Sequence, residues 1–495
     1  MSEKNDILYI FEMANNHQGD VQHGLRIIEA MAKVARDNGI RAAVKFQYRD
    51  LDTFIHQSHQ GSDSKHIKRF RETRLTPEQY LTLVEATRDA GLATICTPFD
   101  EVSVRDIVNH GIEIIKVASC SANDWPLLET VAAARKPVIC STGGLRIDQI
   151  DQVVNFLEHR KVDFSMLHCV GIYPTPTDGL YLNFMERMMD RYNWIRVGYS
   201  GHEDPDDTDV VKVAVAKGAR ILERHVGVAT ASIKLNAYSM NPDQTDKWVK
   251  ASLKALRIGG SEGREKRVVQ DEVDSLMSLR RGAFARVPLR KGEQISADKV
   301  YFAMPCAEGQ TSSSEWLSSM LASRDYVADE GLVERRSASL ATTLRSLIHQ
   351  GKGMLYEARI KIGPKYTVEM SHHYGPENFR SHGALIVNLI NREYCKKLVI
   401  VFPGQRHPNH RHIKKEEVFQ VLHGDLEAVV DGKVHHLKPG DMLLIERGNW
   451  HSFTSVGGCV FEEVSTTHVV GDSYYEDPKI AQLDPMQRKT VLEMW

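Results

Sequence analysis

The chain has 495 residues, a formal net charge of −2 and seven scattered cysteines. Its length exceeds what a single hydrophobic core supports, so two or three domains are expected, and its balanced charge argues against nucleic acid or an anionic membrane as the main partner. No apolar run approaches the roughly 18 residues of a membrane span and the polar start lacks a signal-peptide core, so we expect a protein of the reducing cytoplasm.

Eight short apolar runs, each followed by a polar residue, recur along the first half of the chain. They are 7–11, 42–46, 92–96, 113–117, 137–141, 164–168, 195–199 and 221–225. Amphipathic helical patterns separate them, for example 21–38 closed by Gly39 and 77–90 closed by Gly91. Eight strands alternating with helices predict an α/β fold, a (β/α)8 TIM barrel over 1–258, with its site at the carboxyl ends of the strands.

The segment 48–76 is longer than an ordinary connection in such a barrel. It is rich in His, Gln, Ser and Lys, and it is either a mobile lid or an insertion over the site.

Beyond the barrel the composition changes twice. The stretch 259–279 is interpreted as a linker because its first part is rich in glycine and charge. A small β-rich module is predicted over 280–341. From Gly353 onward, regularly spaced Gly and Pro turns predict an all-β barrel or sandwich, and 342–495 is assigned to it.

Side chains suited to chemistry follow the predicted strands of the barrel. In chain order they are Glu12, Asn16, Lys45, Gln47, Thr97, Lys116, Ser119, Ser141, Tyr173, Ser200, His202 and His225. Lysines and hydroxyl groups that converge on one barrel mouth suit a multiply charged anion such as a phosphate. The imidazoles of His202 and His225, from adjacent strands, suit a divalent metal ion with open positions. Each residue alone is more often structural, but their joint occurrence at strand ends favours an active site.

A set of short strings matches a known family in order and spacing. They include Asn15-Asn16-His17, Lys45-Phe46-Gln47, Thr97-Pro98-Phe99, Lys116-Val117-Ala118-Ser119, Ser141-Thr142-Gly143, Gly198-Tyr199-Ser200-Gly201-His202, Glu223-Arg224-His225 and Ser239-Met240-Asn241-Pro242. On these strings the chain resembles the sialic acid synthase family over 7–258. The 280–341 module resembles, more weakly, the antifreeze-like (SAF) domain of that family.

The resemblance implies a condensation of phosphoenolpyruvate with a sugar aldehyde. It places phosphoenolpyruvate on Lys45, Lys116, Thr97, Ser119, Ser141 and Ser200, a manganese-like ion on His202 and His225, and the substrates also near Asn16 and Gln47. Glu12 is expected to contact the sugar or manage the proton, and Tyr173 to line the sugar pocket. In the family the SAF domain covers the barrel mouth of the partner subunit, which implies a domain-swapped homodimer.

Three positions depart from the family pattern, all in the half that holds the sugar. Ser121 stands where a glutamate is usual, Leu235 where an aspartate is usual, and Met304 where an arginine that holds the N-acetyl group is usual. A smaller difference places Gly171 where asparagine is common. We infer that the acceptor is an unphosphorylated aldose or aminosugar aldehyde other than N-acetylmannosamine.

The C-terminal region carries a metal-binding pattern. His410-Arg411-His412 is followed by Glu417, Gly424, Gly448 and His451, which matches the two motifs of the cupin family except for Glu446 in place of a proline. Alternation along a strand places both imidazoles of a His-x-His string on one face. Three imidazoles and a carboxylate leave open positions on an octahedral ion, so His410, His412, Glu417 and His451 predict a site for Mn, Fe, Ni or Zn.

The role of the cupin has two interpretations. The string around His410 and Glu417 resembles cupin sugar isomerases such as the lyxose isomerase group, so the site would open or isomerise the sugar that the barrel consumes. The rival is a sugar-binding or sensing lobe without turnover. For the whole chain we expect a metal-dependent synthase of a 3-deoxy-ulosonic acid. The alternatives are a barrel aldolase or synthase that uses phosphoenolpyruvate or pyruvate on a different acceptor, and a carbohydrate-binding or regulatory protein on an inactivated synthase barrel.

Overall fold

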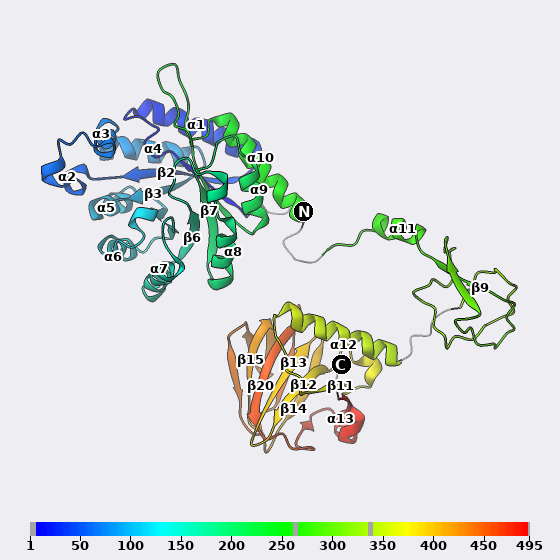
Figure 1. Ribbon diagram of the computed structural model, residues 1–495. Helices are drawn as coiled ribbons and strands as arrows, with labels where there is room; N and C mark the ends of the chain where they lie inside the picture. Colours follow the sequence, from blue (N-terminus) through cyan, green and yellow to red (C-terminus); the bar gives the residue numbers. More distant parts are fainter. Residues whose placement is uncertain (1–5, 261–265, 335–339, 494–495) are drawn as a thin grey trace. The chain divides into compact units, whose positions relative to one another are not determined.

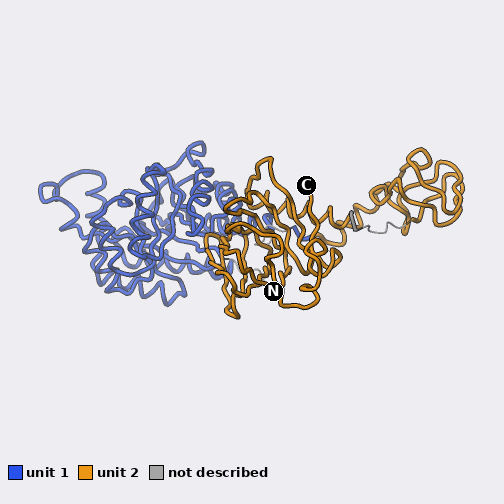
Figure 2. Tube along the Cα trace, turned by 90° about the horizontal axis from the view of Figure 1, so that it is seen from below, with its two compact units in different colours: residues 1–267 blue, residues 268–495 orange. Residues whose placement is uncertain are grey.

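A computed structural model describes residues 6–260, 266–334 and 340–493. The chain divides into two compact units, Met1–Arg267 and Val268–Trp495 (Figure 2). Residues 261–265 of the predicted linker and 335–339 of the predicted β-rich module lie outside the described residues. All seven cysteines are free, as expected.

The first unit is built on a closed barrel of eight parallel strands (Figure 1). The strands are β1 (Leu8–Glu12), β2 (Arg41–Tyr48), β3 (Ala93–Pro98), β4 (Ile114–Val117), β5 (Val138–Ser141), β6 (Phe164–Cys169), β7 (Arg196–Gly201) and β8 (Ile221–His225). β1 closes the barrel against β8, with Glu12 opposite His225. The predicted TIM barrel is confirmed, and each strand lies close to its predicted run.

Helices connect the strands and surround the barrel (Figure 1). They are α1 (Val21–Asn38), α4 (Pro77–Asp89), α5 (Glu101–Asn109), α6 (Trp125–Ala133), α7 (Ile147–His159), α8 (Leu182–Arg191), α9 (Asp209–Ala216) and α10 (Pro242–Gly259). Local signals set their ends. The Asp20 carboxylate caps α1, which stops at Gly39 with a φ of 60°. Thr76 and Gln79 form a capping box on α4.

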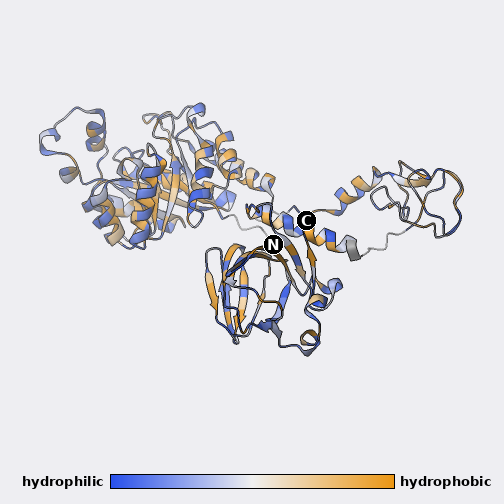
Figure 3. Cartoon of the chain, turned by 60° about the horizontal axis from the view of Figure 1, so that its bottom comes forward, coloured by the Kyte–Doolittle hydropathy of each residue, from blue (hydrophilic) through white to orange (hydrophobic). Residues whose placement is uncertain are grey.

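The barrel helices carry both hydrophobic and hydrophilic residues, as expected for helices with one face on the strands (Figure 3). None of the described helices offers a continuous stretch apolar enough for a bilayer crossing.

Apolar side chains fill the inside of the barrel up to a defined level. The interior cluster consists of Leu8, Ile10, Ala43, Ile95, Ile139, Leu167 and Ile221. Because strand side chains alternate, the next inward positions on β1, β2 and β8 lie two residues further along. Those positions carry Glu12, Lys45 and Glu223, all buried. The apolar core therefore gives way to charged groups at the carboxyl end of the barrel.

The 48–76 segment is a folded insertion. It contains α2 (Leu51–Phe54), a short 3-10 turn over Gln57–His59, and α3 (Lys65–Glu72). The Arg49 guanidinium lies 4.1 Å from the ring centroid of Phe70 and 3.7 Å from that of Phe99, which follows β3. This cation–aromatic stack joins α3 to the end of the barrel.

The β-rich module expected after the linker is present in its described part. β9 (Gly282–Ala285) pairs antiparallel with β10 (Val300–Ala303), and the module has an apolar core of its own. Helix α11 (Gln270–Ser278) lies inside the predicted linker.

The C-terminal region contains two sheets. The seven-stranded sheet has the order β18-β15-β20-β13-β12-β11-β22, and the five-stranded sheet has the order β17-β16-β19-β14-β21. The strands are β11 (Thr367–Ser371), β12 (Ala384–Asn391), β13 (Tyr394–Val401), β14 (Arg406–Arg411), β15 (Glu417–Gly424), β16 (Leu426–Val430), β17 (Lys433–Leu437), β18 (Met442–Ile445), β19 (His451–Thr454), β20 (Cys459–Thr466), β21 (Tyr474–Tyr475) and β22 (Lys489–Leu492). The predicted β architecture of this region is confirmed.

The prediction that β structure begins at Gly353 is wrong, because α12 (Leu340–Glu357) runs through that position. Leu347 and Leu355 are buried on one side of this helix. Gly351 permits the close approach, since a Cβ atom there would lie 2.3 Å from Cδ2 of Leu385 on β12. Gly351 therefore serves helix packing, whereas Gly353 lies within the helix with open space around it.

Candidate active sites of the barrel and the cupin

Two lysines and two glutamates form a buried ion network at the carboxyl ends of the barrel strands. The Nζ atom of Lys45 lies 2.5 Å from Oε2 of Glu12 and 2.9 Å from Oε1 of Glu223. The Nζ atom of Lys116 lies 3.7 Å from the same Glu223 oxygen and donates to Oγ of Ser141 at 2.6 Å. The four charged side chains are at most 6% exposed. Buried charges persist when they are paired, so the barrel holds a preformed polar centre.

Glu223 is a central residue of this network that sequence reasoning did not assign. Its Oε1 atom also accepts from Oγ of Ser200 at 3.0 Å. Its Oε2 atom is buried and has no hydrogen-bond partner among the described residues. The alternation of β8, which places Glu223 and His225 on the same face, is the signal that would have found it.

The network separates the two glutamates in acidity. Burial raises the pKa of Glu12, with repulsion from Glu223 adding to the effect and Lys45 opposing it. Burial also acts to raise the pKa of Glu223, but attraction to Lys116 and Lys45 outweighs it and lowers that pKa. Glu223 therefore keeps its negative charge, and Glu12 is the more readily protonated of the two.

The hydroxyl groups predicted to bind phosphate lie around the same strand ends. The hydroxyl oxygen of Thr97 is buried and has no hydrogen-bond partner among the described residues. Oγ of Ser119 accepts from the backbone N–H of Gly143 at 3.0 Å, and a Cβ atom on Gly143 would lie only 2.7 Å from that oxygen. Gln47 accepts from Arg49 at 2.8 Å.

His202 and His225 lie side by side at the ends of β7 and β8, with ring centroids 5.4 Å apart. Nδ1 of His202 donates to the carbonyl oxygen of Val170 at 3.1 Å, which leaves Nε2 with its lone pair. Burial lowers the pKa of His202 to about 4 and holds the pKa of His225 well below its usual range. Both rings are therefore neutral, the form that binds a metal ion.

Two tyrosines enclose the histidine pair. The ring centroid of Tyr173 lies 4.2 Å from that of His202, and the centroid of Tyr238 lies 5.0 Å from that of His225. The two tyrosine centroids are 5.3 Å apart. Tyr173 is a predicted site residue, whereas Tyr238 was missed because nothing local marks it; the loop after β8 brings it over the histidines.

A buried ion pair holds the loop that carries His202. Nη1 of Arg224 lies 2.5 Å from Oε1 of Glu203, and Nη2 donates to the Glu203 carbonyl oxygen at 2.9 Å. Gly201 is required here, because a Cβ atom would lie 2.2 Å from the Glu203 carboxylate.

Asn16 uses its side-chain amide to hold two loops together. Its Nδ2 atom donates to the carbonyl oxygen of Val226 at 2.8 Å and to Oγ of Ser239 at 3.1 Å. These bonds join the loop after β1 to the loop after β8, so the amide hydrogens are engaged within the protein.

The three positions that depart from the family pattern have different surroundings. Ser121 is buried in the loop after β4, and Met304 is 57% exposed. Leu235 packs against Gly227, where a Cβ atom would lie 2.7 Å from its Cδ2 atom. Two of the three positions thus carry apolar side chains, Leu235 and Met304.

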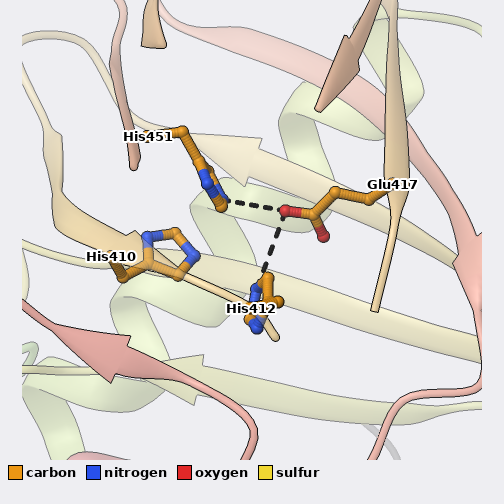
Figure 4. A group of neighbouring side chains, drawn as sticks. All are labelled: His410, His412, Glu417 and His451. Carbon is orange, nitrogen blue, oxygen red and sulfur yellow. Dashed lines mark ion pairs between the residues drawn. The ribbon is translucent and has the colours of Figure 1, made fainter. Parts of the chain in front are cut away.

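The four predicted cupin ligands point toward one another (Figure 4). One ligand atom from each of His410, His412, Glu417 and His451 lies within 4.8 Å of the others, and all four residues are buried. Nε2 of His451 lies 2.8 Å from Oε1 of Glu417, and Nε2 of His412 lies 3.7 Å from it. Strands β14, β15 and β19 supply or border these residues, so the β fold assembles the cluster.

Backbone carbonyl groups orient all three cupin histidines. Nδ1 of His410, His412 and His451 lies 3.1, 2.7 and 3.2 Å, respectively, from the carbonyl oxygens of Pro408, Asp472 and Asn449. A carbonyl oxygen only accepts hydrogen bonds, so each Nδ1 carries the proton. Each Nε2 therefore has a lone pair with which it can coordinate a metal ion. Three such nitrogens and one carboxylate fit a divalent ion.

The cluster opens onto a cavity that is partly open to solvent. Lys397, Lys415 and Glu463 also line this cavity, and sequence reasoning did not predict them. Oε1 of Glu463 accepts from Nζ of Lys397 at 3.1 Å and from Nζ of Lys415 at 2.9 Å. Lys415 also forms an ion pair with Glu417, which links this set to the metal ligands.

Comparison with known proteins assigns both regions. The model of the NeuB family matches residues 31–263, and the model of the cupin domain matches residues 397–465. An uncharacterised protein of Methanocaldococcus jannaschii is 32% identical over 63% of this chain and 88% of its own length. The chain belongs to the NeuB family.

Named synthases and a solved structure extend the comparison of this NeuB-family protein. Human N-acetylneuraminate-9-phosphate synthase is 26% identical over 58% of this chain and 80% of its own. The N,N'-diacetyllegionaminic acid synthase of Legionella pneumophila is 27% identical over 60% and 85%. A crystal structure described as spore coat polysaccharide biosynthesis protein E of Chromobacterium violaceum is 47% identical, with a TM-score of 0.63 over 66% and 98%. The protein is an enzyme of the sialic acid synthase type.

Proposed function

We propose that this protein is a metal-dependent synthase that joins phosphoenolpyruvate to an unphosphorylated aldose or aminosugar aldehyde, giving a 3-deoxy-ulosonic acid and phosphate. The observation that carries the proposal is the buried network of Glu12, Lys45, Lys116 and Glu223 beside the His202–His225 pair. The relatives named as N-acetylneuraminate-9-phosphate and diacetyllegionaminic acid synthases support this class of product.

The lysines and serines of the network are the proposed phosphoenolpyruvate ligands. Lys45 and Ser200 donate hydrogen bonds to Glu223, whereas Lys116 forms an ion pair with it and donates to Ser141. A phosphate or carboxylate group that enters the mouth would take over some of these donors, because charge-assisted bonds to an oxyanion are strong. Thr97 offers a buried hydroxyl without a partner among the described residues, and Ser119 lies at the same end of the barrel.

The reaction requires the barrel to give a proton to the aldehyde oxygen and to take a proton from the attacking water. Carbon 3 of phosphoenolpyruvate attacks the aldehyde carbon, and the aldehyde oxygen takes up a proton. Water then adds its oxygen at carbon 2 and loses one proton; the bond between carbon 2 and the phosphate oxygen breaks, and the second proton of the water leaves with the phosphate as the 2-oxo group forms. Glu12 is the proposed proton carrier, since its raised pKa lets it give a proton to the new hydroxyl and its ionised form can take one from the water. Glu223 stays ionised and holds Lys45 and Lys116 in position.

His202 and His225 would hold a divalent ion, with manganese proposed, and such an ion supplies Lewis-acid activation of the aldehyde. Tyr173 and Tyr238 border this pair and would line the acceptor pocket. In the cupin, His410, His412, Glu417 and His451 would hold a second ion, Mn, Fe, Ni or Zn, and the domain would bind or isomerise a sugar. A homodimer that exchanges the SAF-like module is the proposed assembly.

The direct test is phosphate release from phosphoenolpyruvate in the presence of manganese, across a panel of unphosphorylated aldoses, hexosamines and the matching ketoses. We expect release with one class of aldehyde. Release with a ketose that requires an intact His410 would show that the cupin isomerises the sugar for the barrel. No release with any sugar would support the alternative, a carbohydrate-binding or regulatory protein on an inactivated barrel.

A further inference from the structure

The cupin cavity has a second polar group of residues, beside the metal ligands, that the proposed chemistry does not use. Lys397, Lys415 and Glu463 have side chains that are at most 8% exposed, and all three line the cavity. Glu463 bonds to both lysines, and Lys415 also pairs with the metal ligand Glu417. Two lysines and two carboxylates therefore form one buried cluster, and both lysines lie on the wall of the cavity that the predicted metal ligands face.

The charges around the cavity cancel only while no cation is bound. Lys397 and Lys415 balance Glu417 and Glu463, and Glu369, also in the lining, pairs with Lys489 at 3.2 Å. The histidines of the lining contribute no charge to the metal-bound state. Nδ1 of His407, His410 and His412 donates its proton to a backbone carbonyl oxygen, so Nε2 carries none when it binds an ion, and burial lowers the pKa of His468 to about 3.

A divalent ion on the predicted ligands therefore leaves the cavity with two uncompensated positive charges. The guanidinium of Arg488, 4.9 Å from the ring centroid of Tyr475 in the lining, adds to the positive potential. In a half-enclosed cavity such an excess is unfavourable unless the ligand brings negative charge.

The ligand set restricts the shape of that negative group. Four protein ligands leave two positions on a six-coordinate ion, and a molecule with two neighbouring oxygen atoms fills both. A carboxylate oxygen next to a 2-oxo or 2-hydroxy oxygen meets this demand and carries a negative charge, whereas a hydroxy-carbonyl sugar meets it without the charge. The phenylalanines of the lining, Phe419, Phe453 and Phe461, offer apolar surface to a carbon skeleton.

We infer that the cupin cavity binds a 2-oxo or 2-hydroxy carboxylate in preference to a neutral sugar, with Lys397 and Lys415 selecting the negative charge. The 3-deoxy-ulosonic acid made by the barrel belongs to this class. The identity of the natural ligand rests on the proposed function, whereas the preference for a carboxylate rests on the cavity alone.

The test is isothermal titration calorimetry on the full chain loaded with manganese, with His202→Ala and His225→Ala introduced to silence the barrel. The probes are N-acetylneuraminate, its methyl ester, which keeps the skeleton but lacks the charge, and N-acetylmannosamine. We expect the acid to bind at least about tenfold more tightly than the ester or the neutral sugar. Equal or tighter binding of the ester or the neutral sugar would overturn the inference, and this comparison needs no change in the cupin.

A pair of lysine variants tests whether Lys397 is responsible for the preference for the negatively charged ligand. Lys397→Met is expected to lower the affinity for the acid about tenfold or more while manganese content, measured by mass spectrometry, is unchanged. The matched control is Lys396→Met on the same strand, whose lysine is 40% exposed and pairs with Glu462 at 2.7 Å. Equal affinities in the two variants would show that Lys397 does not select the charge. If Lys397→Met fails to fold, Lys397→Arg must retain the preference for the acid over its ester.

Phosphate release by the unmodified chain separates the two proposals. Phosphate release without binding of the acid to the cupin would contradict this inference and leave the proposed function standing. Binding of the acid to the cupin without phosphate release in the presence of any acceptor sugar would contradict the proposed function, and the inferred ligand class of the cavity would still hold.

Discussion

The barrel mouth and the cupin cavity both combine lysines, carboxylates and histidines, but they differ in what the carboxylates hold. In the barrel, Glu12 and Glu223 are bound to lysines, and His202 and His225 stand as a pair of imidazoles. In the cupin, Glu417 faces three histidines besides its ion pair with Lys415, so one carboxylate joins the histidine cluster to the lysines. Among the described residues, the cupin set alone gathers three or more such ligand groups closely enough for one ion.

This difference teaches that the two regions would hold an ion in different ways. Two imidazoles leave most positions of an ion to solvent and substrate, so the barrel ion should exchange readily and depend on the substrates. Three imidazoles and a carboxylate, each oriented by the backbone or by a salt bridge, should retain an ion without a substrate.

The largest expected effect is the loss of barrel chemistry when one lysine of the network is removed. Lys116→Met takes away a cation and the donor to Ser141, so phosphate release from phosphoenolpyruvate should fall about a thousandfold or more. Cupin metal content should be unchanged. Lys250→Met, an exposed lysine on α10, is the control. A folded Lys116→Met protein that retains activity within about tenfold would remove Lys116 from the site.

The second effect concerns the cupin alone. His412→Ala removes one of four ligands, so the affinity for the tightly held ion should fall about a hundredfold, and dialysed protein should lose roughly one ion per chain. Phosphate release with an aldose should persist, since the barrel has its own histidine pair. Exposed His436→Ala serves as the control. Equal retention of metal by His412→Ala and His436→Ala would contradict the cupin site. Loss of the barrel ion together with the cupin ion in His412→Ala would show that the two sites do not hold their ions independently.

The third effect separates barrel stability from barrel chemistry. His17 is fully buried in the loop after β1, and burial, aided by His23 and Arg69, lowers its pKa from 6.5 to about 4. Between these pH values the unfolded state binds more protons, so the stabilisation is complete above pH 6.5 and is lost as the pH falls toward 4.

Replacing His17 should therefore flatten the acid dependence of barrel stability. His17→Gln is expected to reduce the loss of unfolding free energy between about pH 7 and pH 4.5 by up to roughly 3 kcal/mol, measured by chemical denaturation. Exposed His59→Gln should leave the pH dependence as it is. The same slope in both variants would show that His17 is not the titrating group.

The smallest effect tests the aromatic wall beside the barrel histidines. Tyr238→Ala removes the ring that lies 5.0 Å from His225, so the KM for the acceptor should rise about tenfold while the KM for phosphoenolpyruvate is unchanged. Tyr238→Phe keeps the ring and should retain most of the acceptor affinity. An equal rise in the KM for the acceptor and the KM for phosphoenolpyruvate would show that Tyr238 stabilises the site as a whole and does not contact the acceptor specifically.

The fold could be predicted from the sequence where the same pattern, a short apolar run followed by an amphipathic helix, recurs along the chain. Eight apolar runs with helical patterns between them define the barrel, since only such runs supply buried parallel strands. The His-x-His string predicted correctly that the two imidazoles lie close together, because both lie on one stretch of backbone. Gly353 misled because glycine also occurs inside helices, and α12 contains Gly353 in open space as well as Gly351 at its close contact with Leu385.

The sequence by itself determined the barrel, the position of its mouth and the four residues of the cupin cluster, because strand alternation and strand ends are local properties. Only the tertiary structure decided that Glu223 joins Lys45, Lys116 and Ser200, that Tyr238 covers His225, and that Lys397 and Lys415 share Glu463. These contacts bring together residues from strands far apart in the chain, and no local pattern records which distant partner neutralises a buried charge.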